Sequence, residues 1–143
     1  MTIARVMANQ PVHEVVTCEA TIPLREAVAL LAERRIGALP VHEGERIVGI
    51  FSERDVIYTL AQHGADALDR PVREVMTAPA VTISPETSVL SALSLMTKRR
   101  IRHLPVTRDG RTVGFISIGD LVKYRIDHIE AEAEALRSYI QTA

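Results

Sequence analysis

Apolar residues recur at helical spacing in two separate stretches of the chain. In both stretches they follow the i, i+3, i+6, i+7 pattern that places one helix face in a core. The residues are Leu24, Ala27, Leu30 and Leu31 in the first stretch and Val89, Ala92, Leu95 and Met96 in the second. A proline stands near the start of each stretch and paired arginines stand at its end, which suits the two ends of a helix. We therefore predict helices over residues 23–34 and 87–99.

Shorter apolar runs around these helices predict strands. Residues 15–18 and 80–83 have the composition of brief strands. Two hairpins are expected, from residues 39–42 with 46–51 and from residues 104–107 with 111–116. Their turns are Glu43-Gly44-Glu45 and Asp109-Gly110, which interrupt the apolar runs with glycine. A second helix should follow each hairpin, so the expected order in each half is strand, helix, strand, strand, helix.

The two halves are copies of one unit. Adding 65 to residue numbers 17–55 gives 82–120 without a gap, and many identities result, including the Leu-Pro-Val segments. Residues 3–8 and 72–77 also resemble each other, and each is expected to open its copy with a short helical turn. Units of this length are marginal alone, so the copies should share a core. We divide the chain into residues 1–66, residues 67–125 and a C-terminal helical extension, 126–143, with 64–71 as a linker.

The last helix continues beyond the repeat and carries a heptad pattern. Its apolar residues are spaced 4, 3, 4, 3, 4: Val122, Ile126, Ile129, Ala133, Leu136 and Ile140. Acidic residues Glu130, Glu132 and Glu134 lie beside them. The stripe needs a partner surface, which is either the chain's own domain or a second copy. We favour a homodimer because the stripe runs well past the repeat.

Composition excludes several classes of protein. The chain has 143 residues, 47% hydrophobic and 24% charged, which is typical of globular proteins. A formal charge of −1, the absence of tryptophan and the absence of a long basic run argue against nucleic acid as a partner. No apolar run is long enough for a signal peptide or a membrane span. Cys18 is alone, which excludes an intrachain disulfide and suits a cytoplasmic location.

One polar motif occurs in both copies. Gly-x-x-Ser-x-x-Asp appears with Gly49, Ser52 and Asp55, and again at residues 114, 117 and 120. At a helix start, Ser-x-x-Asp can simply cap the helix. Alternatively, the serine hydroxyl and the free N–H groups can bind a phosphate while the carboxylate accepts the hydroxyls of a ribose. The glycine allows a ligand or another backbone to approach closely. The pattern therefore favours a nucleotide site without excluding a cap.

A second pair of matching segments precedes these motifs: Ile36-Gly37-Ala38-Leu39-Pro40-Val41 and Ile101-Arg102-His103-Leu104-Pro105-Val106. With both pairs of motifs, the chain resembles a tandem CBS-domain pair, the Bateman module, over residues 3 to about 125. The resemblance implies an α+β fold of two β-α-β-β-α repeats, related by a pseudo-twofold axis and packed through their sheets. It also implies a homodimer and ligands such as AMP, ADP, ATP, NAD(H) or S-adenosylmethionine. Both motifs have Ser where the family more often has Thr, which keeps the hydroxyl.

In the family, certain residues of each repeat contact the nucleotide. The matching positions of this sequence give two predicted nucleotide clefts, one for each repeat. The first would use Thr17, Cys18, Ala38, Pro40, Ser52 and Asp55, and the second Thr82, Ile83, His103, Pro105, Ser117 and Asp120. We prefer the second cleft, because Arg102 and His103 replace Gly37 and Ala38 there and Lys123 lies one turn after the motif. In the first cleft Arg54 is the nearby cation. The alternative is that Arg54 is a solvent-exposed arginine at a helix start with no role in binding.

The sequence predicts no enzyme. The histidines show no metal-ligand spacing with one another or with Cys18, and neither a catalytic triad nor a Walker loop is recognisable. We expect a free-standing, non-catalytic module that binds an adenosine nucleotide and signals to a separate effector protein. The alternatives are a structural dimerisation protein with vestigial sites and, third, a nucleotide-processing enzyme.

Overall fold

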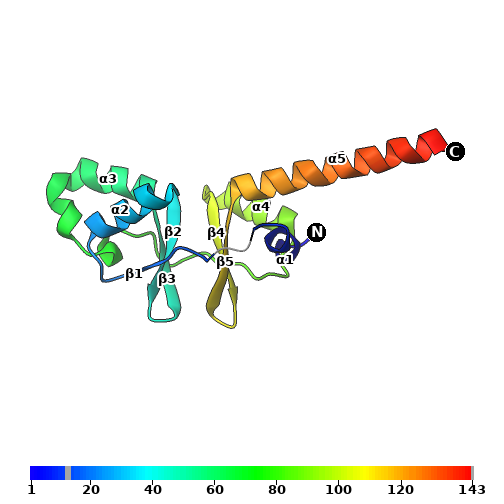
Figure 1. The fold of residues 1–143 in the computed structure, drawn as a ribbon. Coiled ribbons are helices and arrows are strands. Elements are labelled where there is room, and N and C mark those ends of the chain that lie inside the picture. The colour runs from blue at the N-terminus through cyan, green and yellow to red at the C-terminus, as the bar shows by residue number, and fades with distance from the viewer. Residues whose placement is uncertain (12–13, 143) are drawn as a thin grey trace.

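Two β-hairpins stand side by side at the centre of the molecule, with the helices arranged around them (Figure 1). The computed structural model describes residues 1–11 and 14–142. The elements of the first half are α1 (Ile3–Ala8), β1 (Cys18–Glu19), α2 (Leu24–Arg34), β2 (Ala38–Glu43), β3 (Arg46–Ser52), α3 (Glu53–His63) and the 3₁₀ helix η1 (Gly64–Asp69). Those of the second half are the 3₁₀ helix η2 (Val72–Glu74), α4 (Val89–Arg99), β4 (His103–Arg108), β5 (Arg111–Ser117) and α5 (Ile118–Thr142). The predicted α+β fold is confirmed, and so is the element order, except that a single bridge stands in place of the first strand of the second half.

Both hairpins have the tight turns that the sequence predicts. β2 pairs antiparallel with β3, and β4 with β5. Gly44 has a φ of 63°, and Asp109 and Gly110 have φ values of 53° and 77°. These left-handed conformations suit glycine and aspartate, and they match the right-handed twist of the flanking strands.

The predicted first strands are much shorter than expected. Only Cys18 and Glu19 pair with β2, in parallel, and in the second repeat a single bridge joins Ile83 to Val106. Each segment lies at a sheet edge and meets the hairpin over one or two residues. The residues just before these pairs line cavities instead.

The two helices predicted from apolar spacing are confirmed almost to the residue. α2 begins directly after Pro23, whose missing N–H costs nothing at that position. α4 begins two residues later than predicted, because the hydroxyl of Ser88 accepts a hydrogen bond from the N–H of Ser91 (3.0 Å) and caps the helix there. Both helices end in a left-handed arginine, Arg35 or Arg100.

Packing does not follow the sequence division at residue 66. Each repeat has its own cluster of buried apolar residues, yet Ile3 and Val6 of α1 belong to the second cluster, and Ala67 and Val72 belong to the first. Backbone hydrogen bonds fix both exchanges: the N–H of Ile3 donates to Thr87 O (2.9 Å), and the N–H of Val72 donates to Ile22 O (2.9 Å). The predicted linker is therefore a packed 3₁₀ helix, and each opening turn lies against the other copy.

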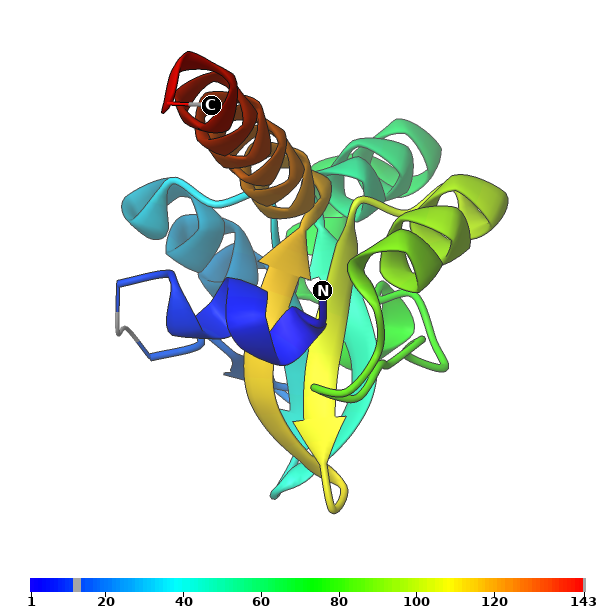
Figure 2. The same cartoon turned by 90° about the vertical axis from the view of Figure 1, so that its right-hand side faces the viewer.

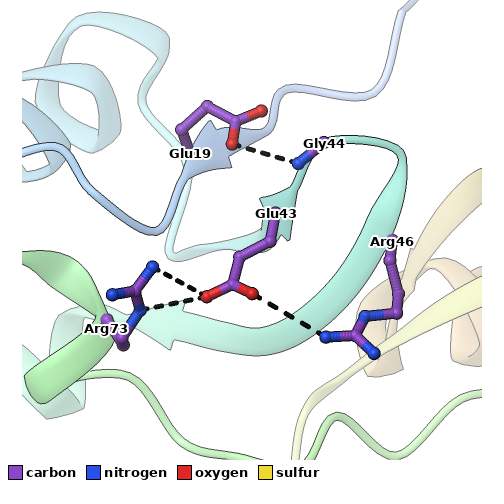
Figure 3. Close-up of polar contacts among 5 residues, drawn as sticks. All are labelled: Glu19, Glu43, Gly44, Arg46 and Arg73. Atoms are coloured by element: carbon purple, nitrogen blue, oxygen red, sulfur yellow. Dashed lines mark hydrogen bonds and ion pairs between the residues drawn. The ribbon is translucent and has the colours of Figure 1, made fainter.

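Charged side chains hold η2 against the first repeat (Figure 3). Oε1 of Glu43, at the end of β2, accepts hydrogen bonds from Nε (3.0 Å) and Nη2 (2.9 Å) of Arg73. The other oxygen of Glu43 lies 3.7 Å from Arg46, and Glu19 accepts from the N–H of Gly44 (3.3 Å). The fork geometry on Glu43 fixes where the chain enters its second half.

The repeats meet through their sheets, as the resemblance implies. Figure 2 shows the β4–β5 hairpin in front of the β2–β3 hairpin. His42 on β2, which is buried, hydrogen-bonds through Nε2 to Oγ1 of Thr112 on β5 (2.9 Å), and Arg111 pairs with Glu45 (3.2 Å). Burial lowers the pKa of His42, while Glu19 opposes that shift.

α5 runs away from the body of the molecule (Figures 1 and 2). Leu121 is fully buried and Tyr124 packs against the second core, but the residues of the heptad stripe remain exposed. Ile126 is 50% exposed and Ile140 is 64% exposed. The alternative in which this stripe packs on its own domain is therefore wrong for the part of the chain that the structure describes. No helix in that part is apolar enough over a sufficient length to cross a membrane.

Candidate functional site: two cavities between the repeats

Two cavities lie where the repeats meet. The Asp55 cavity, named after its motif carboxylate, has a volume of about 620 Å³, and the Asp120 cavity one of about 470 Å³. Both volumes are in the range of small-molecule sites. Gly37, Ala38 and His103 line both cavities, so the two sites are neighbours.

Each cavity combines the motif of one repeat with segments of the other. The Asp55 cavity takes Ser52, Glu53, Arg54 and Asp55 from the first repeat, and Thr77, Pro79, Ala80, Val81, Arg99, Arg100, Ile101 and Arg102 from the second part of the chain. The Asp120 cavity takes Ser117 and Asp120 from the second repeat, and Glu14, Val15, Val16 and Ile36 from the first. A molecule bound in either cavity would contact both repeats.

The cavity linings combine residues of both repeats, whereas the sequence analysis grouped the site residues within each repeat. The motif at the end of one hairpin faces the start of the other hairpin, because the pseudo-twofold arrangement places the hairpins side by side. Of the predicted residues, Ala38, Ser52, Arg54, Asp55, Arg102, His103, Ser117 and Asp120 line a cavity. Thr17, Cys18, Pro40, Thr82, Ile83, Pro105 and Lys123 are absent from the described linings of both.

Burial explains most of these absences. Cys18 and Ile83 point into the two cores, and Pro40 and Pro105 are buried in the middle of strands. Burial also raises the pKa of the Cys18 thiol to about 11, so it is a protonated core group with low reactivity. The sequence analysis missed the wall residues that precede each short strand, such as Val15, Val16 and Val81. Their signal was the apolar run at residues 15–18 and 80–83, which we assigned wholly to strands.

The Asp55 carboxylate is engaged on both oxygens. Oδ2 accepts hydrogen bonds from the N–H (2.9 Å) and the hydroxyl (3.1 Å) of Ser52, while the N–H of Asp55 donates to Oγ of Ser52 (3.4 Å). This is a capping box at the start of α3. Oδ1 accepts from the hydroxyl of Thr77 (3.1 Å), which belongs to the other half of the chain. The cap predicted as one alternative is thus present, and the Asp55 carboxylate also holds the segment that follows η2.

The Asp120 carboxylate is less fully engaged. Oδ2 accepts from the N–H of Ser117 (2.9 Å), and the N–H of Asp120 donates to Oγ of Ser117 (3.0 Å). No hydrogen bond to Oδ1 is present among the residues that the structure describes. This oxygen can accept from a bound hydroxyl without displacing a protein group.

Both motif glycines lie against protein atoms of the other copy's opening segment, and Gly114 also lines the Asp120 cavity. A Cβ on Gly49 would lie 2.6 Å from Sδ of Met76 and 2.8 Å from the carbonyl oxygen of Thr77. A Cβ on Gly114 would lie 2.8 Å from Cε of Met7. The short segment that opens each copy therefore crosses the glycine of the other copy's motif. At Gly49 this is the second of the two alternatives that the sequence left open, the close approach of another backbone, whereas at Gly114 the close atoms belong to the Met7 side chain.

A comparison with known families decides what this arrangement is. The sequence profile of the CBS domain matches residues 3–62 and 72–127. The chain belongs to the CBS-domain family. Its two halves are the two repeats of a CBS pair, and the cavities described above lie between them.

Relatives of this chain occur in plants and in bacteria. The mitochondrial CBS domain-containing protein CBSX3 of Arabidopsis thaliana is 35% identical over 129 residues, which are 87% of this chain and 63% of the relative. The chain thus spans less than two thirds of that protein. A CBS-domain protein from Burkholderia ambifaria MC40-6 is 36% identical and superposes with a TM-score of 0.83, covering 89% of this chain and 95% of that one.

A third comparison involves a structure with ligands. The CBS domain pair of protein MJ0100, solved in complex with 5′-methylthioadenosine and S-adenosyl-L-methionine, is 25% identical with a TM-score of 0.75. The match covers 87% of this chain and 98% of that one. CBS pairs of this kind are regulatory modules, and some of them bind adenosine compounds.

The two cavities of this CBS pair differ in charge. Arg54, Arg99, Arg100 and Arg102 line the Asp55 cavity beside Glu53 and Asp55. Among the described residues that line the Asp120 cavity, Glu14 and Asp120 are acidic and none is Lys or Arg. The arginines thus gather at the Asp55 cavity, and Arg102, which the sequence analysis assigned to the second cleft, lines the cavity that holds the motif of the first repeat.

His103 lies between the two cavities. Its ring stacks on Phe115, with centroids 5.3 Å apart and an interplanar angle of 13°. Burial lowers the pKa of His103 and Arg102 lowers it further, whereas Asp120 and Glu53 act in the opposite direction. The imidazole is therefore neutral at pH 7.

The depressed pKa of His103 makes the stability of the protein depend on pH. Between the pKa of the folded state and the ordinary value of 6.5, the unfolded state binds more protons, so stability falls as pH falls below 6.5. His42 acts in the same direction. We expect urea midpoints to fall from pH 7.5 to pH 5.5, and to fall less in His103→Gln. An equal fall in the variant would show that His103 is not the group responsible.

Among the described residues, no group of three His, Cys, Asp or Glu side chains is placed to hold a metal ion. The polar side chains that line the two cavities carry hydroxyls, carboxylates, guanidinium groups, the amide of Gln10 and one neutral imidazole. Such groups can bind a sugar and an anion.

Proposed function

We propose that this CBS pair is a non-catalytic regulatory module that binds adenosine-containing nucleotides in the cavities between its repeats. The observation that carries the proposal is the composition of each cavity: a Ser-Asp motif at a helix start faces apolar wall residues of the other repeat. The motif offers a carboxylate to the hydroxyls of a ribose, and the walls offer an apolar surface to a base. The adenosine ligands of the related MJ0100 pair support this assignment.

The Asp55 cavity suits a phosphorylated ligand such as AMP, ADP, ATP or NAD(H). Its arginines can form charge-assisted, bidentate contacts with phosphate oxygens. Asp55 would exchange its bond with the Thr77 hydroxyl for bonds with the ribose hydroxyls. Thr77 follows η2, which packs on the first repeat, so binding would replace the contact between the start of α3 and this segment with contacts through the ligand.

The Asp120 cavity suits an adenosine compound that carries no phosphate. Its two carboxylates would repel a polyphosphate, and its described lining offers no guanidinium or ammonium group to offset that charge. A neutral or cationic nucleoside, of the chemical class of methylthioadenosine or S-adenosylmethionine, avoids this repulsion.

Regulation requires that the ligand prefer one arrangement of the repeats, or of two subunits, over another. We propose that the preferred arrangement is recognised by an effector protein and that the module acts as a homodimer in the cytoplasm. The ligand then changes the population of the recognised form in proportion to its differential affinity.

Thermal unfolding with a panel of ligands tests the proposal. At a concentration one hundred times the dissociation constant, a ligand stabilises the folded state by about 2.7 kcal/mol, which raises the melting temperature by several degrees. We expect ATP or another adenine nucleotide to do so, and GTP at the same concentration to do so much less. Incubation should leave ATP intact, and turnover would instead indicate an enzyme.

A structural dimerisation protein with vestigial sites is the second candidate. The capping box favours it, because Ser52 and Asp55 already satisfy each other without a ligand. The same panel separates the two candidates. If AMP, ATP, NADH and S-adenosylmethionine all leave the melting temperature unchanged, the binding proposal is wrong and the structural one stands.

A further inference from the structure

We infer that residues 122–140 of α5 bind the same segment of a second copy as a parallel, in-register two-stranded coiled coil. The inference goes beyond the nucleotide sites, and it specifies how two chains associate. It rests on the exposed stripe of α5 and on the charges on either side of that stripe.

The stripe is a continuous apolar seam on a helix that the body of the protein does not cover. Val122, Ile129 and Leu136 occupy the d positions of successive heptads and are 44%, 48% and 60% exposed. Ile126, Ala133 and Ile140 occupy the a positions, so both rows of the seam are apolar. The seam extends over about 27 Å of helix.

The seam is accessible to a second helix. Leu121, which is buried, and Tyr124, which packs on the second core, face the chain's own repeat. Val122 lies one residue, and hence about 100°, around the helix from Leu121. A second α5 can therefore approach from the side without meeting the body of the first molecule.

Flanking charges determine the orientation. In a parallel pair, each g residue faces the e residue of the following heptad in the other chain. Arg125 at g then faces Glu130 of the second copy, and Glu132 at g faces Arg137 of the second copy. Both pairs are attractive, and the symmetry of the dimer repeats each of them.

An antiparallel pair with the same overlap would be repulsive. In that orientation e residues face e residues and g residues face g residues. Glu130 would face Glu130 of the second copy, Glu132 would face its own counterpart, and Lys123 would face Arg137. Like charges at each of these positions disfavour the arrangement.

The charged side chains are free to change partners. Within one chain, Glu132 pairs with His128 (3.2 Å) and Arg137 pairs with Glu134 (3.4 Å). These side chains are mostly exposed, and exposed pairs contribute little to stability. Replacing these intrachain pairs by ion pairs with the second copy therefore costs little free energy.

Sedimentation of the full chain tests the association. We expect a dimer for the wild type and a monomer for the double variant Ile129→Glu/Leu136→Glu. Both side chains are about half exposed or more, so the fold does not depend on them. The matched control is Ala131→Glu/Ser138→Glu, which adds the same charge to the opposite face of the helix and should remain dimeric. A monomeric wild type, or a dimer in both double variants, would overturn the inference.

Charge reversal and cross-linking test the orientation. Arg137→Glu should raise the dissociation constant of the dimer about tenfold, and adding Glu132→Arg should restore it. In a Cys18→Ala background, Ile140→Cys should form a disulfide between copies. A disulfide between Val122→Cys chains and Ile140→Cys chains would show an antiparallel pair and overturn the parallel one.

The outcome is independent of the nucleotide proposal, because both cavities are built within one chain. The monomeric variant should keep the wild-type response to ATP in thermal unfolding. Loss of the dimer with retention of that response separates the two proposals.

Discussion

The double variant Arg99→Ala/Arg102→Ala is expected to raise the dissociation constant for ATP between tenfold and a hundredfold. Both guanidinium groups line the Asp55 cavity, and a hydrogen bond to a charged group contributes about 1.5–3 kcal/mol. Both arginines are exposed, so solvent screening reduces each contribution to about 0.7–1.4 kcal/mol. The affinity for adenosine, which carries no phosphate, should change less than twofold. Isothermal titration of each ligand gives both numbers.

A matched control distinguishes phosphate contacts from a general effect of positive charge. Arg34 occupies in the first repeat the position that Arg99 occupies in the second, and the described linings of both cavities lack it. Arg34→Ala should leave the affinity for ATP within about twofold of the wild type, given screening at physiological salt. Equal losses of ATP affinity in Arg34→Ala and in Arg99→Ala/Arg102→Ala would mean that the arginines act only through the overall electrostatic potential of the protein.

The second large effect is expected on stability, from Gly49→Ala. The added Cβ would meet the Sδ of Met76 and the backbone carbonyl of Thr77, at distances that real Cβ atoms do not adopt. Thr77 cannot move away easily, because its N–H and C=O form hydrogen bonds of 2.9 Å with Ile50. Overpacking of this kind costs about 2–3 kcal/mol, and urea unfolding would measure the loss.

Gly114→Ala, the equivalent change in the other repeat, should be much milder. Its Cβ meets the end of the flexible Met7 side chain, which can change rotamer. The smaller entropy of the unfolded chain with alanine also offsets part of the cost. We expect the free energy of unfolding to stay within about 1 kcal/mol of the wild type. A loss as large as that of Gly49→Ala would show that the α1 segment is as rigid as the Thr77 segment.

The sequence carried enough information for the local structure of this protein. The spacing of Leu24, Ala27 and Leu31 predicted α2 because one helix face must be buried. The Asp109-Gly110 turn predicted the second hairpin because few other residues adopt left-handed φ values. The 65-residue offset between Asp55 and Asp120 revealed the duplication and thereby the family.

Arrangements between the repeats could not be predicted from these patterns. Periodicity shows which face of an element is buried, but two copies of one unit have the same periodicity and offer the same partners. For this reason Arg102 was assigned to the motif of its own repeat, whereas it faces Asp55 across the interface. Ile3 and Val6 likewise lie in the second core, because so short a turn gives no indication of the hairpin against which it packs.

The dual use of the Ser-Asp motif also lay outside what the sequence could settle. A cap and a ligand site require the same residue types at the same spacing, since both use a hydroxyl and a carboxylate at a helix start. The structure has the cap at both motifs. Only Asp55 also bonds to the other half of the chain, through Thr77. A nucleotide in that cavity would therefore act on the contact between α3 and the segment that follows η2.

A crystal structure of the protein soaked with ATP is the most direct test of nucleotide binding between the repeats. We predict density for the ribose within hydrogen-bond distance of the Asp55 carboxylate, phosphates beside Arg102 and the base against the wall formed by Ala80 and Val81. An empty Asp55 cavity at saturating ATP, or ATP bound only outside the two cavities, would contradict the account.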